Sequence, residues 1–329
     1  MNRELLALDS RPGRQALPPD EGSVARFAIE AERMASSISA VVVTSPATVR
    51  LALVGLFSEG HILLEDLPGV GKTLLAKTIA RSIDGVFKRV QFTPDLLPSD
   101  ITGTTVFEAH TGKFQFIAGP VFSNILLADE VNRTGPRTQA ALLEAMAEAQ
   151  VTVDGELRQL RQPFTVIATQ NLSESHGTFP LPDSQKDRFL ISMGIGMPSV
   201  EQEVEILARA QRGSPEARPV LTTDRVIEMQ ALVKSVEVSQ PVRQYLVNVL
   251  RAVRQHRDIW YGASPRGGTA LQRASQCLAL FNARSFVTPE DIREMAVHVL
   301  THRLILKPGA SISEREAVLS VLDEVPVPA

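Results

Sequence analysis

A glycine-rich loop between a strand and a helix constrains this chain more than any other feature. Its sequence is Asp66-Leu67-Pro68-Gly69-Val70-Gly71-Lys72-Thr73. The apolar run before it, residues 61–65, predicts a short buried strand, and residues 71–82 predict a helix. Backbone N–H groups in a tight loop at a helix N-terminus bind phosphate. The context is therefore that of a P-loop.

Each part of this loop has an expected task. Lys72 can reach the β- and γ-phosphates of a nucleotide, and the Thr73 hydroxyl can bind Mg²⁺. Gly69 and Gly71 allow a close backbone approach that a Cβ would hinder. Asp66 departs from the general motif, which begins with glycine. The predicted ATP-binding residues are Asp66, Leu67, Pro68, Gly69, Val70, Gly71, Lys72, Thr73, Leu74 and Asp129, and the predicted Mg²⁺ ligands are Thr73 and Asp129.

A second apolar run, Ile125–Asp129, predicts a strand that ends in acid. In P-loop enzymes such an aspartate, here Asp129, holds Mg²⁺, usually through water. The adjacent Glu130 can orient and deprotonate the attacking water as a general base. Successive residues of a strand point to opposite faces, so the two carboxylates share one task only if the strand ends there. The following Val131-Asn132-Arg133 indicates that it does.

Two residues of the predicted core stand where a bound nucleotide could be sensed. Asn171 follows an apolar run at 164–169 and could position the water or touch the γ-phosphate, and the alternative is a turn asparagine. Arg188 lies just before the last core strand and could stabilise transition-state charge in a neighbouring subunit. The alternative for Arg188 is a surface ion pair with Asp183 or Asp187.

A third candidate lies far along the chain at the start of a predicted helix. Ser264 is expected to cap this helix and Pro265 to be its first residue. Arg266 would then project from a helix start, where it could meet an anion. The alternative is a solvated arginine.

The order of apolar and amphipathic segments predicts two folded parts. Short strands alternate with helices over 24–197, which indicates an α/β core with a mostly parallel sheet. Two hairpins, with turns at Thr111-Gly112 and Asp154-Gly155, are expected to interrupt it. Residues 198–329 show mainly helix patterns and predict a separate helical domain. Residues 1–23 lack a clear period and predict a flexible tail.

Composition and apolar patterning argue against several classes of protein, although a local basic patch is not excluded. The net charge of -3 gives no general attraction to nucleic acid or anionic lipid. No apolar run approaches the roughly 20 residues that span a bilayer, and no secretory signal is recognisable. The single cysteine, Cys277, fits buried packing in a reducing compartment, so we expect a cytoplasmic protein. His61 is interpreted as a surface or core-edge residue, and Trp260 and Tyr261 as packing residues.

Several long strings together resemble the MoxR family of AAA+ ATPases, from about Ser36 to the end of the chain. They are LLEDLPGVGKT, DLLPSDITGTTVFEAHTGKFQFIAGPVFSNILLADEVNR, TQAALLEAMAEAQVTVDG, FTVIATQN, LPDSQKDRF and GASPRGG. The resemblance implies an AAA+ core with a five-stranded sheet and inserted hairpins, followed by an all-helical lid. It also implies a ring-forming oligomer, often a hexamer, with ATP at the subunit interfaces.

Positions that match the family's motifs imply functional roles for residues of this sequence. One pair of positions departs from the family pattern: Thr44-Ser45 stand near the adenine pocket, where the family usually has Gly-Gln. The implied roles are Walker A for Lys72 and Thr73, Walker B for Asp129 and Glu130, sensor 1 for Asn171, arginine finger for Arg188 and sensor 2 for Arg266.

Three functions remain to be weighed. The first is a remodelling ATPase that acts on client proteins in maturation or metal insertion, and the resemblance implies clients with a von Willebrand factor A domain. The second is a DNA motor, which the mixed tip at 108–113 and the acidic turn at 154–156 argue against, because neither gathers cations for phosphates. The third is a switch that binds ATP without hydrolysis, which the presence of Glu130, Asn171 and Arg188 disfavours.

Overall fold

The computed structural model describes residues 19–66, 69–170, 179–213 and 215–328. The predicted site residues Leu67, Pro68 and Asn171 lie outside these ranges. Within them, no helix is long and apolar enough to cross a membrane.

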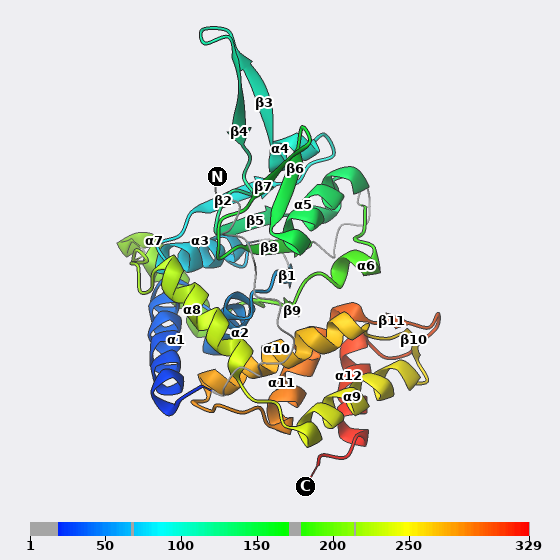
Figure 1. Ribbon diagram of the computed structural model, residues 1–329. Helices are drawn as coiled ribbons and strands as arrows, with labels where there is room; N and C mark the ends of the chain where they lie inside the picture. The colour runs from blue at the N-terminus through cyan, green and yellow to red at the C-terminus, as the bar shows by residue number, and fades with distance from the viewer. Residues whose placement is uncertain (1–18, 67–68, 171–178, 214, 329) are drawn as a thin grey trace, which may run out of the picture.

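A five-stranded parallel sheet forms the core, as the sequence predicts (Figure 1). Its strand order is β2-β5-β8-β1-β9, and every neighbouring pair is parallel. Helices cover both faces of the sheet, which is why the inner strands read as continuous apolar runs. The strands are β1 (Ile62–Glu65), β2 (Phe87–Gln91), β5 (Ile125–Asp129), β8 (Thr165–Gln170) and β9 (Ile191–Met193).

Alternate residues of the strands serve two hydrophobic clusters. On one face, residues such as Leu64 and Ile167 pack with α1 (Glu21–Val41), α2 (Pro46–Phe57) and α3 (Lys72–Ser82). That cluster continues into the lid helices, so the domain boundary at residue 198 stays a prediction.

The opposite face of the sheet carries the second cluster. Leu63, Leu126 and Val166 pack there with α5 (Pro136–Glu148). Because side chains alternate across a strand, α3 and α5 lie on opposite faces of the sheet.

The first helix begins inside the segment that was expected to be a tail. Asp20 caps α1, since its carboxylate accepts a hydrogen bond of 2.9 Å from the N–H of Ser23. An aspartate at this position satisfies a helix N–H that has no partner within the helix. The expected tail is therefore helical from Glu21, and residues 1–18 lie outside the described part of the chain.

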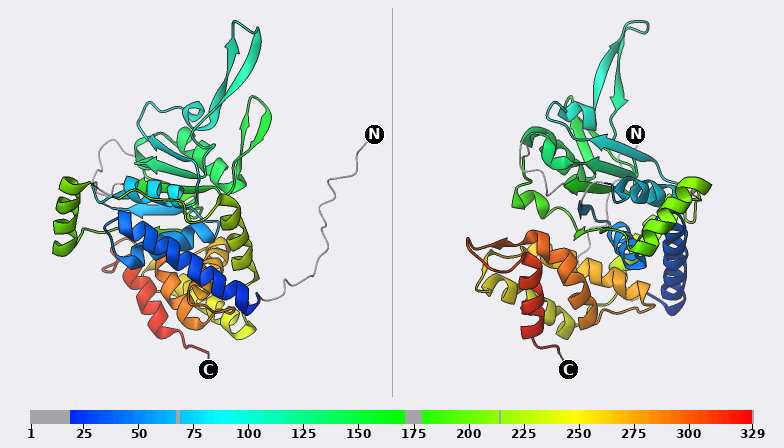
Figure 2. Two further views of the ribbon diagram at one scale, coloured as in Figure 1. Left: turned by 90° about the vertical axis from the view of Figure 1, so that its left-hand side faces the viewer. Right: turned by 180° about the vertical axis from the view of Figure 1, so that it is seen from behind.

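Both predicted hairpins are present, and the longer one projects from the core in every view (Figures 1 and 2). It consists of β3 (Gly103–Glu108) and β4 (Lys113–Ala118), which follow the short helix α4 (Pro98–Thr102). The second hairpin, β6 (Gln150–Val153) with β7 (Glu156–Gln159), turns at Asp154 and Gly155. Both turn residues have positive φ, 53° and 80°, as a type I′ turn requires.

The C-terminal part is helical apart from one small sheet. Two short strands, β10 (Ile259–Tyr261) and β11 (Ile305–Leu306), pair antiparallel there and were not predicted. Trp260 and Tyr261 are 72% and 61% exposed, so their interpretation as packing residues was wrong. Ile259 takes the buried position of this strand instead. The helices are α7 (Val200–Arg212), α8 (Thr223–Ser235), α9 (Gln240–Gln255), α10 (Pro265–Phe281), α11 (Pro289–Leu300) and α12 (Glu314–Glu324).

Two side chains with possible chemistry are structural. Cys277 is buried in α10, as expected, and burial raises the pKa of its thiol to about 12. His61 is also buried, which corrects its interpretation as a surface or core-edge residue. Its Nδ1 accepts a hydrogen bond of 3.0 Å from the N–H of Val166, and its Nε2 donates to the carbonyl of Met146 over 2.9 Å. Only the neutral ring with its proton on Nε2 can do both.

We expect the chain to lose stability as pH falls from about 6.5 toward 4. Burial lowers the pKa of His61 from 6.5 to about 4. Between these pH values the histidine is protonated in the unfolded chain but neutral in the folded chain. The free energy of unfolding should decrease by up to ~3 kcal/mol across this range. Urea unfolding at several pH values would compare wild type with His61→Gln, whose stability should change less with pH. Parallel curves would contradict this assignment.

Candidate active site

The predicted P-loop does join a strand to a helix. β1 ends at Glu65 and α3 begins at Lys72. Gly69 and Gly71 have φ values of 87° and 96°, a left-handed backbone that other residues rarely adopt. A Cβ at either glycine would meet nothing within 4 Å. The space beside both glycines is therefore open, and a phosphate group can approach the backbone there.

The side chain of Lys72 reaches back across the P-loop. Its Nζ donates a hydrogen bond of 3.1 Å to the backbone carbonyl of Asp66. The ammonium group is thus already held over the loop, and it can exchange this neutral acceptor for a phosphate oxygen. The negative charge of phosphate attracts the ammonium more strongly than a neutral carbonyl does, which favours the exchange.

Asp66 ties the first residue of the loop to the segment after β9. Its carboxylate accepts hydrogen bonds from the N–H groups of Ile195 and, over 3.2 Å, Gly196. Gly194 lies so close that an added Cβ would stand 3.3 Å from the Asp66 carboxylate. A glycine at position 66, as in the general motif, could accept neither bond. The acid that departs from the motif is thus a structural anchor.

A cavity of about 510 Å³ opens beside the loop. Its walls come from the end of α1 and the residues after it, from the P-loop, from the segment after β9 and from α7. Such mostly apolar walls suit a planar base, while the loop receives the phosphates. Thr44, which replaces the glycine usual in the family, is one of the lining residues. The others include Val42, Val43, Gly69, Gly71, Leu74, Ile195, Pro198, Ile206 and Leu207.

The two predicted Walker B carboxylates lie where β5 ends. Glu130 has φ 57° and ψ 51°, so the chain leaves the extended conformation directly after Asp129. Thr169 of β8 binds both residues, because its hydroxyl donates to Asp129 Oδ1 over 2.6 Å and accepts from the N–H of Glu130 over 2.8 Å. The strand therefore ends as the sequence predicts, and adjacent carboxylates can face one site.

Polar residues of β2 contact both carboxylates, and sequence reasoning missed them. Arg89 Nη2 lies 2.6 Å from Asp129 Oδ2, and Gln91 Nε2 donates to Glu130 Oε2 over 2.7 Å. Arg133 adds an ion pair of 2.9 Å to the same Glu130 oxygen. The sequence did contain a signal for these contacts. Arg89 and Gln91 are polar residues at alternate positions of a core strand, so their side chains share one face of the sheet.

The donor set at this edge of the sheet fits a magnesium ion. Mg²⁺ prefers hard oxygen ligands, and Asp129 and Thr73 supply a carboxylate and a hydroxyl. α3, which carries Thr73, packs on β5, which ends in Asp129. Arg89, which pairs with Asp129, is half-exposed, and exposed ion pairs are worth at most about 1 kcal/mol. Asp129 can therefore exchange this partner for a metal ion.

For the predicted sensor 1, Asn171, the structure describes only the preceding strand, β8. β8 runs to Gln170, which lies beside Glu65 of β1 in the register of the sheet. The carboxyl end of β8 therefore lies between the P-loop strand β1 and the acidic strand β5, where open α/β sheets bind ligands. Asn171 itself lies outside the described residues.

Arg188 contacts α5 and neither of the aspartates proposed as alternative partners. Its Nη1 donates a hydrogen bond of 3.0 Å to the carbonyl of Leu143 in α5. Asp183 instead lies 3.6 Å from Lys186, and Asp187 pairs with Arg303 of the lid. Arg188 thus sits with the helix on the sheet face opposite to α3.

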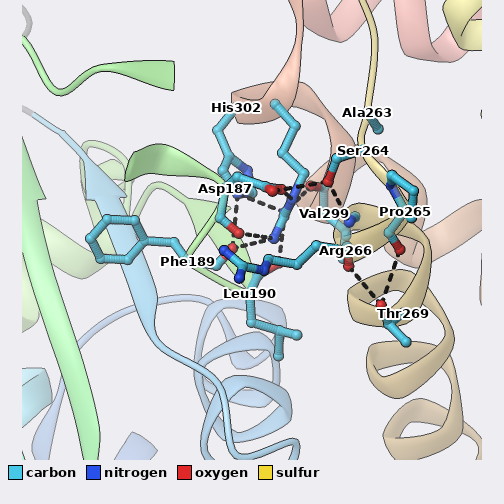
Figure 3. Close-up of polar contacts among 12 residues, drawn as sticks. Asp187, Phe189, Leu190, Ala263, Ser264, Pro265, Arg266, Thr269, Val299 and His302 are labelled. Carbon is cyan, nitrogen blue, oxygen red and sulfur yellow. Dashed lines mark hydrogen bonds and ion pairs between the residues drawn. The ribbon is translucent and has the colours of Figure 1, made fainter. Parts of the chain in front are cut away.

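Arg266 projects from the start of α10, as the sequence predicts. Ser264 caps this helix by accepting a hydrogen bond of 3.3 Å from the N–H of Gly267. Figure 3 shows the Arg266 side chain extending from α10 toward Phe189 and Leu190. Arg266 therefore lies beside the segment that follows Arg188, a proximity that no sequence spacing reveals.

Comparison with known proteins agrees with this geometry. Residues 61–191 match the family model of the ATPase family associated with various cellular activities, and residues 251–321 match an AAA lid domain. The chain is 38% identical to chaperone MoxR1 of Mycobacterium tuberculosis, over 96% of this chain and 87% of that protein. It is 45% identical to YeaC of Bacillus subtilis, over 84% of this chain and 88% of that protein. The chain belongs to the MoxR family of AAA+ ATPases.

A solved structure supports the fold of this MoxR-family chain. A protein of Cytophaga hutchinsonii described as a candidate ATPase superposes with a TM-score of 0.88 and 37% identity. The alignment covers 94% of this chain and 98% of the other. The resemblance inferred from the sequence is thereby confirmed, together with the AAA+ core and helical lid. The roles of single residues in this MoxR-family protein stay predictions.

Proposed function

We propose that this protein hydrolyses Mg·ATP and uses the cycle to remodel client proteins in the cytoplasm. One observation carries the proposal. The P-loop with Lys72 follows one strand of the parallel sheet, and Asp129 and Glu130 end another strand at the same edge. This arrangement supports a single site with a phosphate cradle, a metal ligand and a general base.

The residues divide the proposed reaction among them. Thr73 and Asp129 would hold magnesium, which would neutralise negative charge on the phosphates. Lys72 leaves the Asp66 carbonyl and binds phosphate. Glu130 takes a proton from the attacking water, and Asn171 orients that water. For this step the Glu130 carboxylate must exchange the contact with Gln91 for the water.

We further propose that the site is completed by a second copy of the chain in a ring, as is usual for AAA+ proteins, often a hexamer. Arg188 lies with α5, on the sheet face opposite to α3 and its P-loop lysine. An arginine placed there can reach ATP held by a neighbour. An arginine finger of this kind stabilises charge that develops on the transferred phosphoryl group.

The projecting hairpin favours a protein client over DNA. Phe107 and Phe114 at its outer part are 53% and 75% exposed, and their ring centroids lie 5.2 Å apart. Exposed apolar groups mark protein interaction sites, whereas a DNA-tracking tip needs clustered cations. A client with a von Willebrand factor A domain, matured by metal or cofactor insertion, is the specific form of this proposal and rests on the family resemblance.

The specific ATPase activity should rise with protein concentration as a ring assembles. A site shared between subunits is complete only in the oligomer, so activity and mass should increase together. Steady-state phosphate release with Mg²⁺ would be measured beside light-scattering mass, with and without nucleotide. A monomer with constant specific activity would overturn the shared site.

Subunit mixing provides the control for this experiment. Arg188→Ala retains an intact P-loop, and Lys72→Ala retains an intact Arg188. Each alone should turn over ATP slowly, whereas a mixture contains interfaces that combine both intact groups. Failure of the mixture to regain activity would remove the support for Arg188 acting across the interface.

A further inference from the structure

A polar cluster joins the segment around Arg188 to the lid. We call it the Asp187 cluster, and its members are Asp187, Ser264, His302 and Arg303 (Figure 3). Asp187 follows α6 (Asp183–Lys186) in the core, while Ser264 caps α10 and the other two belong to the 3₁₀ turn η2 (Thr301–Arg303). The cluster is therefore made by three segments that are distant in sequence.

Both oxygens of the Asp187 carboxylate bind lid residues. Oδ1 accepts a hydrogen bond of 2.8 Å from Arg303 Nε, and Oδ2 accepts one of 2.9 Å from the Ser264 hydroxyl. The Arg303 side chain is only 2% exposed. Although burial lowers the pKa of Arg303 to about 10, the guanidinium stays charged at neutral pH. The link is therefore an ion pair between a buried guanidinium and a partly buried carboxylate, with a second hydrogen bond from Ser264.

Arg303 also holds the backbone on both sides of Arg188. Its Nη groups donate to the carbonyls of Asp187 over 3.2 Å and Leu190 over 3.1 Å, and to that of Phe189. His302 Nε2 lies 3.1 Å from the Phe189 carbonyl. Guanidinium groups have five donors in a fixed fork, so one arginine can fix several acceptors at once. The lid thereby fixes the backbone from which Arg188 projects.

The start of α10 is fitted to the same cluster. Ser264 accepts the N–H of Gly267 as a helix cap, which leaves its hydroxyl proton for Asp187. A Cβ at Gly267 would stand 3.0 Å from Cδ of Arg303 and 3.2 Å from Cβ of Ala263, a tight fit that favours glycine at this helix start. In the sequence, Arg266 lies between Ser264 and Gly267. One carboxylate thus binds the segment of Arg188 and the segment of Arg266 together.

The segment that Asp187 begins is anchored at its other end as well. It runs from residue 187 through β9 to Ile195 and Gly196, whose N–H groups bind Asp66 of the P-loop. The same stretch of chain is therefore fastened to the lid at one end and to the phosphate loop at the other.

We infer that Asp187 is a positioning residue that holds Arg188 and Arg266 in a fixed relation by locking the lid onto the core. This inference rests on the proposed function, because it assumes that Arg188 completes a neighbouring site. Asp187 touches no substrate in this role. The proposed role applies after ATP has bound, when Arg188 must stabilise the charge that develops on the transferred phosphoryl group. Loss of the Asp187 carboxylate should therefore lower kcat more than it changes KM.

Asp187→Asn in the full-length protein tests the inference. The amide keeps the volume of the side chain but removes the charge that pairs with Arg303. We expect kcat to fall roughly 10- to 100-fold, since small misplacements of a reacting group have effects of this size. KM and the dissociation constant of a fluorescent ATP analogue should change less than about twofold. A mass measurement would establish that the ring still forms.

Two further variants separate positioning from general stability. Asp291→Asn removes an aspartate that is more deeply buried, 2% exposed against 20% for Asp187, and that lies 2.6 Å from Arg284 in an ion pair wholly within the lid. It should lose stability but keep kcat. Gly267→Ala retains every charged group and crowds Arg303 and Ala263, so it should lower kcat as Asp187→Asn does, and it remains informative if that variant fails to fold.

The outcomes distinguish this inference from the proposed function. If Arg188→Ala loses turnover while Asp187→Asn and Gly267→Ala keep wild-type kcat, the positioning role is overturned and the proposed function stands. If Asp187→Asn and Asp291→Asn lose kcat equally, Asp187 acts only through stability, which also overturns the inference. If Arg188→Ala keeps full turnover, the proposed finger fails, and the role of Asp187 fails with it.

Discussion

Lys72→Ala is expected to weaken ATP binding roughly 100-fold. The Lys72 ammonium lies over the P-loop, 3.1 Å from the Asp66 carbonyl, where β- and γ-phosphates would replace that carbonyl. Removing one partner of a hydrogen-bonded charge pair costs about 2–5 kcal/mol, and about 2.7 kcal/mol is a hundredfold in affinity. Titration with a fluorescent ATP analogue measures the loss directly, without dependence on turnover or ring assembly.

Lys77→Ala is the matched control for this prediction. Lys77 is an exposed lysine on the same helix, α3, and its removal changes the net charge by the same amount. It should bind ATP like wild type. Thermal unfolding of both variants would show whether the loop has been disturbed. Unchanged affinity in Lys72→Ala would mean that this loop does not receive the phosphates.

The P-loop and the sheet could be predicted because their signals are local. Strand β5 has the bounds that the apolar run Ile125–Asp129 indicates. The break after Asp129 is likewise visible from the residues that follow it. In these places propensity and hydrophobic periodicity agree with the tertiary fold, which is typical of sequences that specify one structure.

The contacts that position the candidate site could not be predicted, because they join distant parts of the chain. Asp66 appeared as a departure from a motif, and its role depends on N–H groups some 130 residues away. Asp187 was considered as a partner for its neighbour Arg188, whereas its actual partner is Arg303. From the sequence alone, the expected partner of Asp187 is the nearest residue of opposite charge. In the fold, Asp187 pairs instead with Arg303, whose side chain is buried in the lid.

Two wrong assignments have a common physical cause. The sequence interpretation placed His61 at the surface or core edge and took Trp260 as a packing residue. In the fold, two backbone partners satisfy both nitrogens of His61, so burial is tolerated. Trp260 lies on a short strand of three residues, of which only Ile259 is buried. Residue type gives an average burial, while hydrogen-bond partners and strand position decide the individual case.

Glu130→Gln is expected to lower ATP turnover about 10²- to 10⁴-fold while ATP binding stays within about threefold of wild type. A general base contributes an effect of this size, and an amide cannot accept the proton of the attacking water. The amide can still accept hydrogen bonds from Gln91 and Arg133, which now contact one Glu130 oxygen. The local geometry should therefore survive, and the loss should be confined to the chemical step.

Single-turnover phosphate release, together with the affinity for a fluorescent ATP analogue, separates chemistry from binding in this variant. The ATP-bound form should accumulate, and a ring that ATP stabilises should persist instead of dissociating as ATP is consumed. Glu148→Gln, an exposed glutamate at the end of α5, controls for loss of one negative charge. Normal turnover in Glu130→Gln would assign the base elsewhere. Lost binding would show instead that Glu130 supports the nucleotide pocket, because a group that acts only on the attacking water should not be needed to hold ATP.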